Sequence, residues 1–267
     1  MNTFAGRFAQ LEETIRQCAA FARDNQRRIH RFYKSDGSVL TETDLEISAR
    51  VGQRIAQLFP HDTFICEETP IVRRDESEYT FVLDPIDGTD VYSQGLPSYA
   101  VALGILDRDR RPVGAIIAAP RFGIGREDLF ISLCPGGALH VDGEVFTSSP
   151  DKDRVSQVTM GSTDQARVDF SHFNGKVRTF GSSIIHLVAP VVFSSMQGCV
   201  NQPCFVWDIA ASHAVLLSQG MDIRYCDGSG FEYTDDFLYE KRKYRMDIYA
   251  GTPKGIQEMM DSLPVRV

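Results

Sequence analysis

One short segment, Phe81-Val82-Leu83-Asp84-Pro85-Ile86-Asp87-Gly88-Thr89, constrains this chain more than any other. An apolar strand there delivers two aspartates, three residues apart, into a tight turn. Pro85 fixes one φ angle, and Gly88 tolerates backbone conformations that other residues resist. Such a turn can aim both carboxylates and the carbonyl between them at one point, and hard oxygen ligands suit Mg²⁺. Backbone N–H groups at Gly88 and Thr89 can then hold a phosphate oxygen. A strand that simply ends in an Asp-Gly turn is the alternative interpretation.

Further acidic residues follow apolar runs or open helices. Glu67 and Glu68 come directly after the apolar run 63–66, and Asp208 follows Trp207 in the first turn of a predicted helix. Asp44 lies in the first turn of another predicted helix. Each has an ordinary structural explanation, namely a solvated strand end, a favourable charge at a helix start or a capping arrangement. Their shared placement, where loops gather at one end of the elements, is what a multi-metal site needs.

Charge and composition narrow the classes of function. The chain has 267 residues, of which 43% are hydrophobic and 24% charged, as is typical of a globular protein. Its 28 basic and 36 acidic residues give a formal net charge of −8, which argues against nucleic acid or an anionic membrane as the main partner. A small anionic substrate fits if a metal supplies positive charge. The six scattered cysteines, the absence of a signal-peptide pattern and the short apolar runs favour a cytoplasmic protein.

The spacing of apolar residues predicts a mixed α/β chain. Three- and four-residue spacing predicts a first helix from Phe4 to Ala22, and a second helix opens at Thr41 and is ended by Phe59-Pro60. The basic residues that follow the first helix, Arg23, Arg27, Arg28, Arg31 and Lys34, are interpreted as its solvated end. Strands are predicted at 63–66, 79–83, 99–106, 113–119, 129–133, 138–141, 155–160, 176–179, 199–200, 223–226 and 246–250, and further helices at 182–192, 207–217 and 253–263.

Two prolines and a change of pattern refine this prediction. Pro85 is expected to stop the strand 79–83 at Asp84, and Pro190 to end or kink the helix 182–192. After about residue 148 the pattern changes to alternating strands and helices. We therefore expect an N-terminal α+β lobe at 1–148 with most metal ligands. A C-terminal α/β lobe at 149–267 would contribute Asp208 and the substrate pocket, and the two lobes would share one interface.

Two motifs resemble a known family. Asp84-Pro85-Ile86-Asp87-Gly88-Thr89 and Trp207-Asp208-Ile209-Ala210-Ala211 are similar to the two signatures of the inositol monophosphatase family, which belongs to the lithium-sensitive, Mg²⁺-dependent phosphomonoesterases. The segments 34–44 and 66–68 resemble supporting motifs in family order. The resemblance implies a layered α-β-α-β-α sandwich of the sugar-phosphatase type and hydrolysis of a phosphate monoester. It also implies a homodimer.

The resemblance also implies a role for each site residue. Two or three Mg²⁺ ions would be held by Glu67, Asp84, Asp87, Asp208 and the carbonyl of Ile86. Glu67 and Thr89 would orient the attacking water, with Asp44 holding Thr89. The amides of Gly88 and Thr89 would bind phosphate. Ser182, Asn201 and Asp208 are the remaining candidate substrate contacts, although Ser182 can equally be a helix cap and Asn201 can equally cap the loop at Gln202-Pro203.

Departures from the family pattern leave the substrate open. Inositol enzymes place a glutamate seven residues before the Trp-Asp aspartate, and this chain has Asn201 there. Asp90 and the run 218–221 also differ, which points to an altered leaving-group pocket. The first hypothesis is a phosphatase for an inositol, sugar or related polyol phosphate. A 3′(2′),5′-bisphosphate nucleotidase is the alternative, and a non-catalytic metal- or phosphate-binding member is the third. His186 and His213 are interpreted as ordinary packed or surface histidines.

Overall fold

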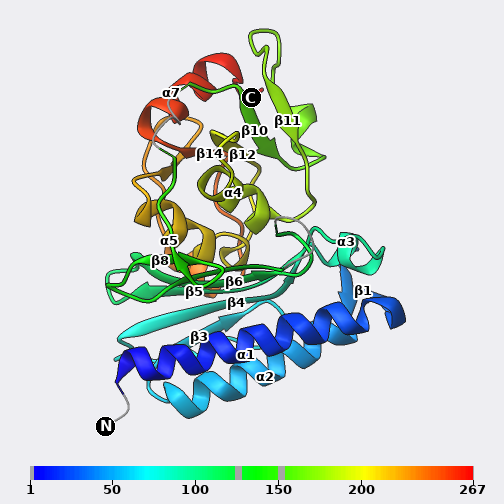
Figure 1. Ribbon diagram of the computed structural model, residues 1–267, viewed down its shortest axis with the longest axis vertical. Helices are drawn as coiled ribbons and strands as arrows, with labels where there is room; N and C mark the ends of the chain where they lie inside the picture. The colour runs from blue at the N-terminus through cyan, green and yellow to red at the C-terminus, as the bar shows by residue number, and fades with distance from the viewer. Residues whose placement is uncertain (1–2, 124–127, 150–153, 267) are drawn as a thin grey trace.

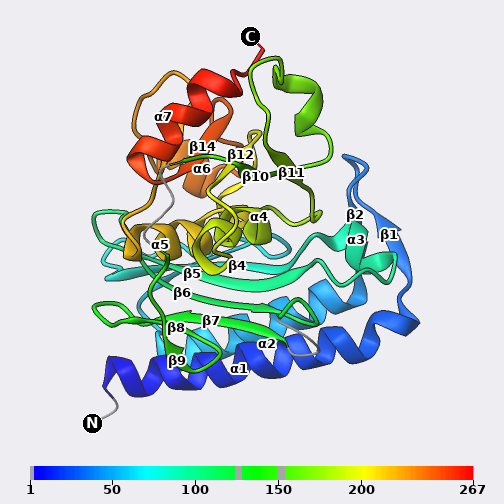
Figure 2. The ribbon, with the colours of Figure 1, turned by 45° about the horizontal axis from the view of Figure 1, so that its top comes forward.

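Five layers make up the chain: helices, sheet, helices, sheet, helix (Figures 1 and 2). The computed structural model describes residues 3–123, 128–149 and 154–266. The first layer holds α1 (Phe4–Asn25) and α2 (Glu42–Leu58), the middle layer α4 (Ser183–Val192) and α5 (Ala210–Ser218), and the last layer α7 (Pro253–Ser262). The expected α-β-α-β-α sandwich is therefore confirmed.

The larger sheet lies between the first two helical layers. In the described part of the chain its strand order is β3-β4-β5-β6-β7-β8-β9. β3 and β4 run parallel, and every later neighbouring pair is antiparallel. The bounds are β3 (Thr63–Cys66), β4 (Tyr79–Asp87), β5 (Ala100–Asp107), β6 (Pro112–Ala119), β7 (Leu129–Leu133), β8 (Leu139–Val141) and β9 (Glu144–Val145).

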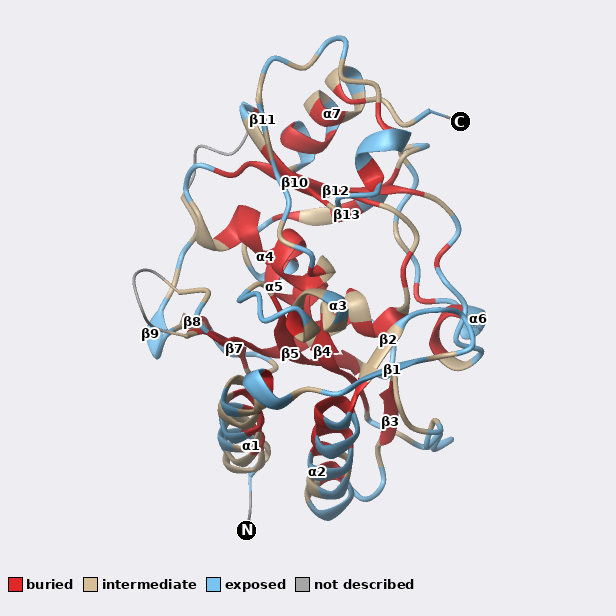
Figure 3. Cartoon of the chain, turned by 90° about the vertical axis from the view of Figure 1, so that its right-hand side faces the viewer, coloured by how far each residue is buried: buried red, intermediate tan, exposed pale blue. Residues whose placement is uncertain are grey.

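Side chains alternate between the two faces of this sheet, as strand geometry requires. On β4, Phe81 and Leu83 join the core beneath α1 and α2, whereas Val82 joins the core beneath α4 and α5. Figure 3 shows the result: the sheet and the middle helices are buried, and the outer faces of α1 and α2 are exposed. The side of β4 that carries Val82 therefore faces the middle layer.

The smaller sheet joins the middle layer to α7. Within the described residues its order is β11-β10-β12-β14-β13, with β10 parallel to β11 and β12, and β14 antiparallel to β12 and β13. The bounds are β10 (Gln157–Met160), β11 (Lys176–Arg178), β12 (Gly198–Asn201), β13 (Asp222–Tyr225) and β14 (Ile248–Gly251). One buried cluster includes residues of both sheets and of α4 and α5, so the two sheets share a core.

Close packing holds α5 against the larger sheet. Ala210 and Ala211 lie over Gly104 of β5, where a Cβ atom would come within 2.7 Å of the Ala211 nitrogen. Since real Cβ atoms avoid such contacts, only glycine allows this approach. The small residues at the start of α5 thus bring the preceding turn close to β4.

Several short elements were not predicted. They are η1 (Gln26–Arg28), β1 (Arg31–Tyr33), β2 (Val39–Thr41), α3 (Thr89–Ser93), β9 (Glu144–Val145), η2 (Asp164–Arg167), η3 (Val206–Asp208) and α6 (Asp235–Tyr239). The interpretation of the basic run as one helix end is wrong for Arg31 and Lys34. α1 ends at Asn25, Arg31 lies in β1, and Lys34 forms ion pairs that are described below.

Pro190 does not end α4, which continues to Val192. A proline removes one N–H, so the carbonyl four residues earlier loses its helical partner. That carbonyl belongs to His186, and it accepts a hydrogen bond from the Thr159 hydroxyl of β10 at 2.7 Å. The neighbouring strand therefore compensates for the bond that the proline lacks.

All six cysteines are free. Among the described residues, no helix has the length and apolar composition needed to cross a bilayer.

The buried histidine of α4 predicts a pH dependence of stability. His186 Nε2 lies 2.7 Å from the Phe180 N–H, which donates to it, and burial lowers the pKa of His186 to about 4. The unfolded chain binds this proton near pH 6.5 and the folded chain near pH 4. Stability should therefore fall by roughly 3 kcal/mol as pH drops through that window.

His186→Gln keeps an acceptor for Phe180 but does not titrate, so its unfolding free energy should lack this loss. Urea unfolding between about pH 7 and pH 4 tests the difference, with the exposed His172→Gln as control. Equal pH dependence in wild type and His186→Gln would contradict the prediction.

Candidate active site

Three aspartates converge between the larger sheet and the middle layer. Asp84, Asp87 and Asp208 each offer a carboxylate oxygen, and these three atoms lie within 4.8 Å of one another. Asp84 and Asp87 come from β4, and Asp208 comes from η3, more than a hundred residues later. The structure thus brings together three residues that were predicted from the sequence as metal ligands.

A bulge in β4 allows both of its aspartates to face the same way. Residues three apart on a regular strand point to opposite faces. Asp84 pairs with Ala102 and Asp87 with Ala100, so Pro85 and Ile86 lie opposite Val101 alone. The extra residue turns Ile86 into the core beneath α1 and α2 and returns Asp87 to the side of Asp84.

The expectation that Pro85 stops the strand at Asp84 is therefore wrong, because β4 runs to Asp87. Pro85 lies inside the bulge, where the ladder does not need its missing N–H. The proline therefore marks the irregularity that builds the site, not the end of the strand.

Asp87 is fixed by the start of α4. Its carboxylate accepts hydrogen bonds from the Ser182 hydroxyl, the Ser183 N–H at 3.3 Å and the Ile184 N–H at 2.7 Å. The Ser182 oxygen in turn accepts from the Ile185 N–H at 3.1 Å and caps the helix. Burial raises the pKa of Asp87 to about 6, although these donors oppose the rise.

Asp208 lies in the 3₁₀ turn that precedes α5, so its expected place in the first turn of the helix is wrong. Its Oδ2 accepts the Phe205 N–H at 2.7 Å, which closes the turn. Burial, followed by the charges of Asp87 and Glu67, raises the pKa of Asp208 well above its usual value. The buried Trp207 stacks on Phe205 and anchors the turn.

The Asp84 carboxylate is the clearest indication of a metal site. Its Oδ1 is buried and has no hydrogen-bond partner among the described residues. Burial and the neighbouring carboxylates of Glu67, Asp87 and Asp208 raise the pKa of Asp84 well above its usual value. An unpaired buried oxygen beside other carboxylates is costly unless a cation compensates. Hard oxygen donors gathered in this way fit Mg²⁺.

Glu67 lies at the end of β3, and its carboxylate is already paired. Lys34 Nζ donates to Glu67 Oε1 at 2.7 Å and to Glu68 Oε1 at 2.5 Å. Burial raises the pKa of Glu67 to about 7, with Glu68 adding to the rise and Lys34 opposing it. The two carboxylates raise the pKa of Lys34, although burial acts in the other direction. Lys34 was not predicted as a site residue, because in the sequence it stands at the end of a run of cations.

Thr89 links the bulge to α2. Its hydroxyl lies 2.8 Å from the Ile86 carbonyl and 3.2 Å from Asp44 Oδ1, and its one proton can go to either. Asp44 Oδ2 accepts from the backbone and the side chain of Thr41 in a capping box. Burial raises the pKa of Asp44 to about 6.

Gly88 makes the turn between β4 and α3. It has φ +89°, and a Cβ there would lie 3.0 Å from the Gly181 carbonyl and 3.1 Å from Val91. Both the conformation and the space favour glycine. Gly88 caps α3, so that helix begins at Thr89, one residue after the end of β4.

Asn201 differs from the other predicted site residues. It is buried at the end of β12, and its amide donates to Tyr244 Oη at 3.3 Å and faces Cys204 Sγ at 3.5 Å. Its role in specificity stays a prediction.

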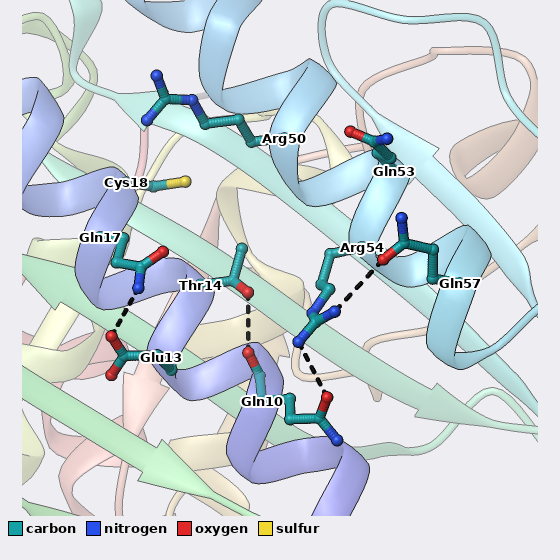
Figure 4. A pocket seen from close by; sticks show the side chains of 9 residues that line it. All are labelled: Gln10, Glu13, Thr14, Gln17, Cys18, Arg50, Gln53, Arg54 and Gln57. Carbon is teal, nitrogen blue, oxygen red and sulfur yellow. Dashed lines mark hydrogen bonds between the residues drawn. The ribbon is translucent and has the colours of Figure 1, made fainter.

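A hollow elsewhere on the molecule is separate from the aspartate cluster and is a weaker candidate for the active site. It has a volume of about 360 Å³ and lies between α1 and α2, on the opposite side of the larger sheet from α4 and α5 (Figure 4). Its arginines are already engaged: Arg54 bonds to Gln10 and Gln57, and Arg50 to Glu46. None of the clustered aspartates lines it.

The chain is similar in sequence to known proteins. The Nus factor SuhB of Haemophilus influenzae is 29% identical over 258 residues, covering 91% of this chain and 89% of that protein. The chloroplastic phosphatase IMPL1 of Arabidopsis thaliana is 25% identical over 218 residues. That match covers 76% of this chain and 57% of IMPL1, so the chain spans little more than half of that relative's length.

A solved structure shares the fold. It is described as an IMPase/NADP phosphatase complexed with Mg²⁺ and phosphate, and it superposes with a TM-score of 0.74 at 16% identity, over 92% of this chain and 90% of that one. The profile of the inositol monophosphatase family matches residues 8–257. The match covers nearly the whole chain, and the protein belongs to the inositol monophosphatase family.

Proposed function

We propose that this protein is a Mg²⁺-dependent phosphatase that hydrolyses a small phosphate monoester, such as an inositol, sugar or related polyol phosphate. The observation that carries the proposal is the cluster of Asp84, Asp87 and Asp208, in which a buried Asp84 oxygen has no hydrogen-bond partner among the described residues. Membership of the inositol monophosphatase family and the metal and phosphate named for the solved relative support it.

The residues that would hold two or three Mg²⁺ ions are Glu67, Asp84, Asp87, Asp208 and the Ile86 carbonyl. When bound, the ions would lower the pKa of a water molecule and neutralise charge on the phosphoryl group and the leaving oxygen. Asp87 is already oriented for this role by three donors from α4, and Asp208 by the Phe205 N–H.

The remaining residues would position the reactants. Thr89, whose hydroxyl lies between Asp44 and the Ile86 carbonyl, would orient the attacking water together with Glu67. Asp44 would fix the Thr89 hydroxyl. The amides of Gly88 and Thr89 would bind the phosphate, and Ser182 would act on substrate through Asp87, to which it donates.

The substrate and the cellular role have alternatives. Because Asn201 stands where inositol enzymes carry glutamate, we expect only weak preference for inositol 1-phosphate. A 3′(2′),5′-bisphosphate nucleotidase is the second candidate. The Nus factor name of one relative raises a third, a protein that binds partners without turnover. The intact acidic cluster supports hydrolysis over that role.

Assembly and location belong to the same proposal. The family resemblance supports a homodimer, and the six free cysteines support a cytoplasmic location. The division into lobes at 1–148 and 149–267 rests on the change from the larger to the smaller sheet.

Removing one carboxylate tests the proposal. Asp84→Asn should keep the fold but lower kcat by on the order of 10²-fold or more, since a key electrostatic group is lost. Wild-type hydrolysis should need Mg²⁺ and stop in EDTA. The assay is phosphate release from inositol 1-phosphate, fructose 1,6-bisphosphate, histidinol phosphate and adenosine 3′,5′-bisphosphate.

Asp36→Asn, at an exposed turn in the resembling segment 34–44, is the matched control and should remain near wild type. Turnover that persists in excess EDTA, or near-normal turnover by folded Asp84→Asn, would refute the proposal. Absence of turnover on every substrate would favour the non-catalytic role.

A further inference from the structure

Four cationic residues follow α6: two arginines that form ion pairs and two lysines that form none with the described residues. Arg242 is neutralised by Asp236 at 3.1 Å and Glu240 at 2.9 Å, and Arg245 by Asp227 at 3.0 Å. Lys241 and Lys243 differ, because neither has a carboxylate within 4.0 Å in the part of the chain that the structure describes. Two exposed ammonium groups therefore have no direct ion-pair partner among the described residues, on a protein of net charge −8.

Both lysines lie beside the candidate active site. Lys243 Nζ is 5.3 Å from the ring centroid of Phe205, and the Phe205 N–H donates to Asp208 Oδ2 at 2.7 Å. Lys241 Nζ donates to the Glu67 carbonyl at 2.7 Å and lies 5.5 Å from the Trp207 centroid. The two ammonium groups therefore flank the turn that delivers Asp208.

The aromatic rings beneath the lysines hold these cations in place. Phe205 and Trp207 stack with centroids 4.8 Å apart and an interplanar angle of 17°. Each ring has a stacking partner and an ammonium over it, which is a favourable cation–π arrangement. The two lysines therefore place positive charge where a ligand can meet it. The stacked and covered rings leave little free aromatic surface on which a base could stack.

We infer that Lys243, assisted by Lys241, recognises a second phosphoryl group on the leaving group, so that the preferred substrate is a bisphosphorylated sugar or polyol. This inference rests on the proposed function. One phosphoryl group would occupy the aspartate cluster with its metal ions. The other would form a charge-assisted hydrogen bond with the Lys243 ammonium.

The reaction stays a single hydrolysis. The water oxygen bonds to phosphorus, the P–O bond to the leaving group breaks, and the released alkoxide takes a proton. The second phosphoryl group remains on the product. Lys243 would therefore act on specificity by binding, and its removal should change KM more than kcat.

The test compares two substrates that differ only in the second phosphoryl group, fructose 1-phosphate and fructose 1,6-bisphosphate. Lys243→Gln should raise KM for the bisphosphate about 10-fold with kcat within about twofold, and leave the monophosphate unchanged. Lys243→Arg should restore most of the preference. Arg242→Gln, which removes a neighbouring cation that is already neutralised, is the matched control and should behave as wild type. Added salt should weaken the wild-type preference.

Direct binding separates this inference from the proposed function. Calorimetry measures fructose 6-phosphate, the leaving group with its second phosphoryl group, against fructose. Wild type should bind fructose 6-phosphate about 10-fold more tightly than Lys243→Gln does.

If neither fructose ester is hydrolysed, the proposed function fails for these sugars, and the binding comparison alone decides the inference. Equal binding by wild type and Lys243→Gln would overturn it. Equal losses on both substrates, or equal losses in Lys243→Gln and Arg242→Gln, would also overturn it. A wild-type preference for adenosine 3′,5′-bisphosphate over fructose 1,6-bisphosphate would overturn the assignment to sugars and polyols.

Discussion

Mutual repulsion among clustered carboxylates is the constraint around which this structure is arranged. Asp84, Asp87 and Asp208 lie within 4.8 Å of one another, and Glu67 raises the pKa of two of them. Without a compensating cation, carboxylates this close together would either move apart or remain protonated. The fold opposes that movement with separate restraints: the bulge of β4, the start of α4 and the closed turn at Phe205.

The layered architecture explains why these restraints come from distant parts of the chain. The middle helices start next to the end of β4, so the first turn of α4 can donate to Asp87, and the 3₁₀ turn η3 before α5 can carry Asp208 to it. Gly104 lets α5 approach β5 closely enough to bring η3 into place. The same layer is covered by the smaller sheet, whose Thr159 hydroxyl satisfies the carbonyl freed by Pro190. Packing and site geometry therefore depend on the same contacts.

Several elements could be predicted from the sequence for local reasons, whereas the layered sandwich came from the family resemblance. The strands at 63–66 and 129–133 have their predicted bounds because they are mostly apolar segments between polar turns. The capping box at Thr41 and Asp44 was visible because it is defined by a spacing of three residues. The clustering of Asp208 with Asp84 and Asp87 came from resemblance to a family, since no local pattern connects residues so far apart.

The features that were missed depend on contacts across the fold. The bulge at Pro85 appears only when β4 is paired with β5, and a proline taken alone suggests a strand end. Lys34 lies at a distance of 33 residues from Glu67, so its ion pair has no signature in spacing. Arg242 has a carboxylate partner, whereas Lys243 lies over Phe205 and has none among the described residues. No sequence pattern predicts this difference between two neighbouring cations.

The most direct test of the carboxylate account is the stability of Asp84→Asn without and with metal. Urea unfolding at about pH 8 in EDTA should give Asp84→Asn an unfolding free energy equal to or above that of wild type, because one repelling charge is gone. Mg²⁺ should stabilise wild type by mass action and reverse that order. If Asp84→Asn is less stable than wild type by the same amount in EDTA and in Mg²⁺, the carboxylates are ordinary structural groups and the account is wrong.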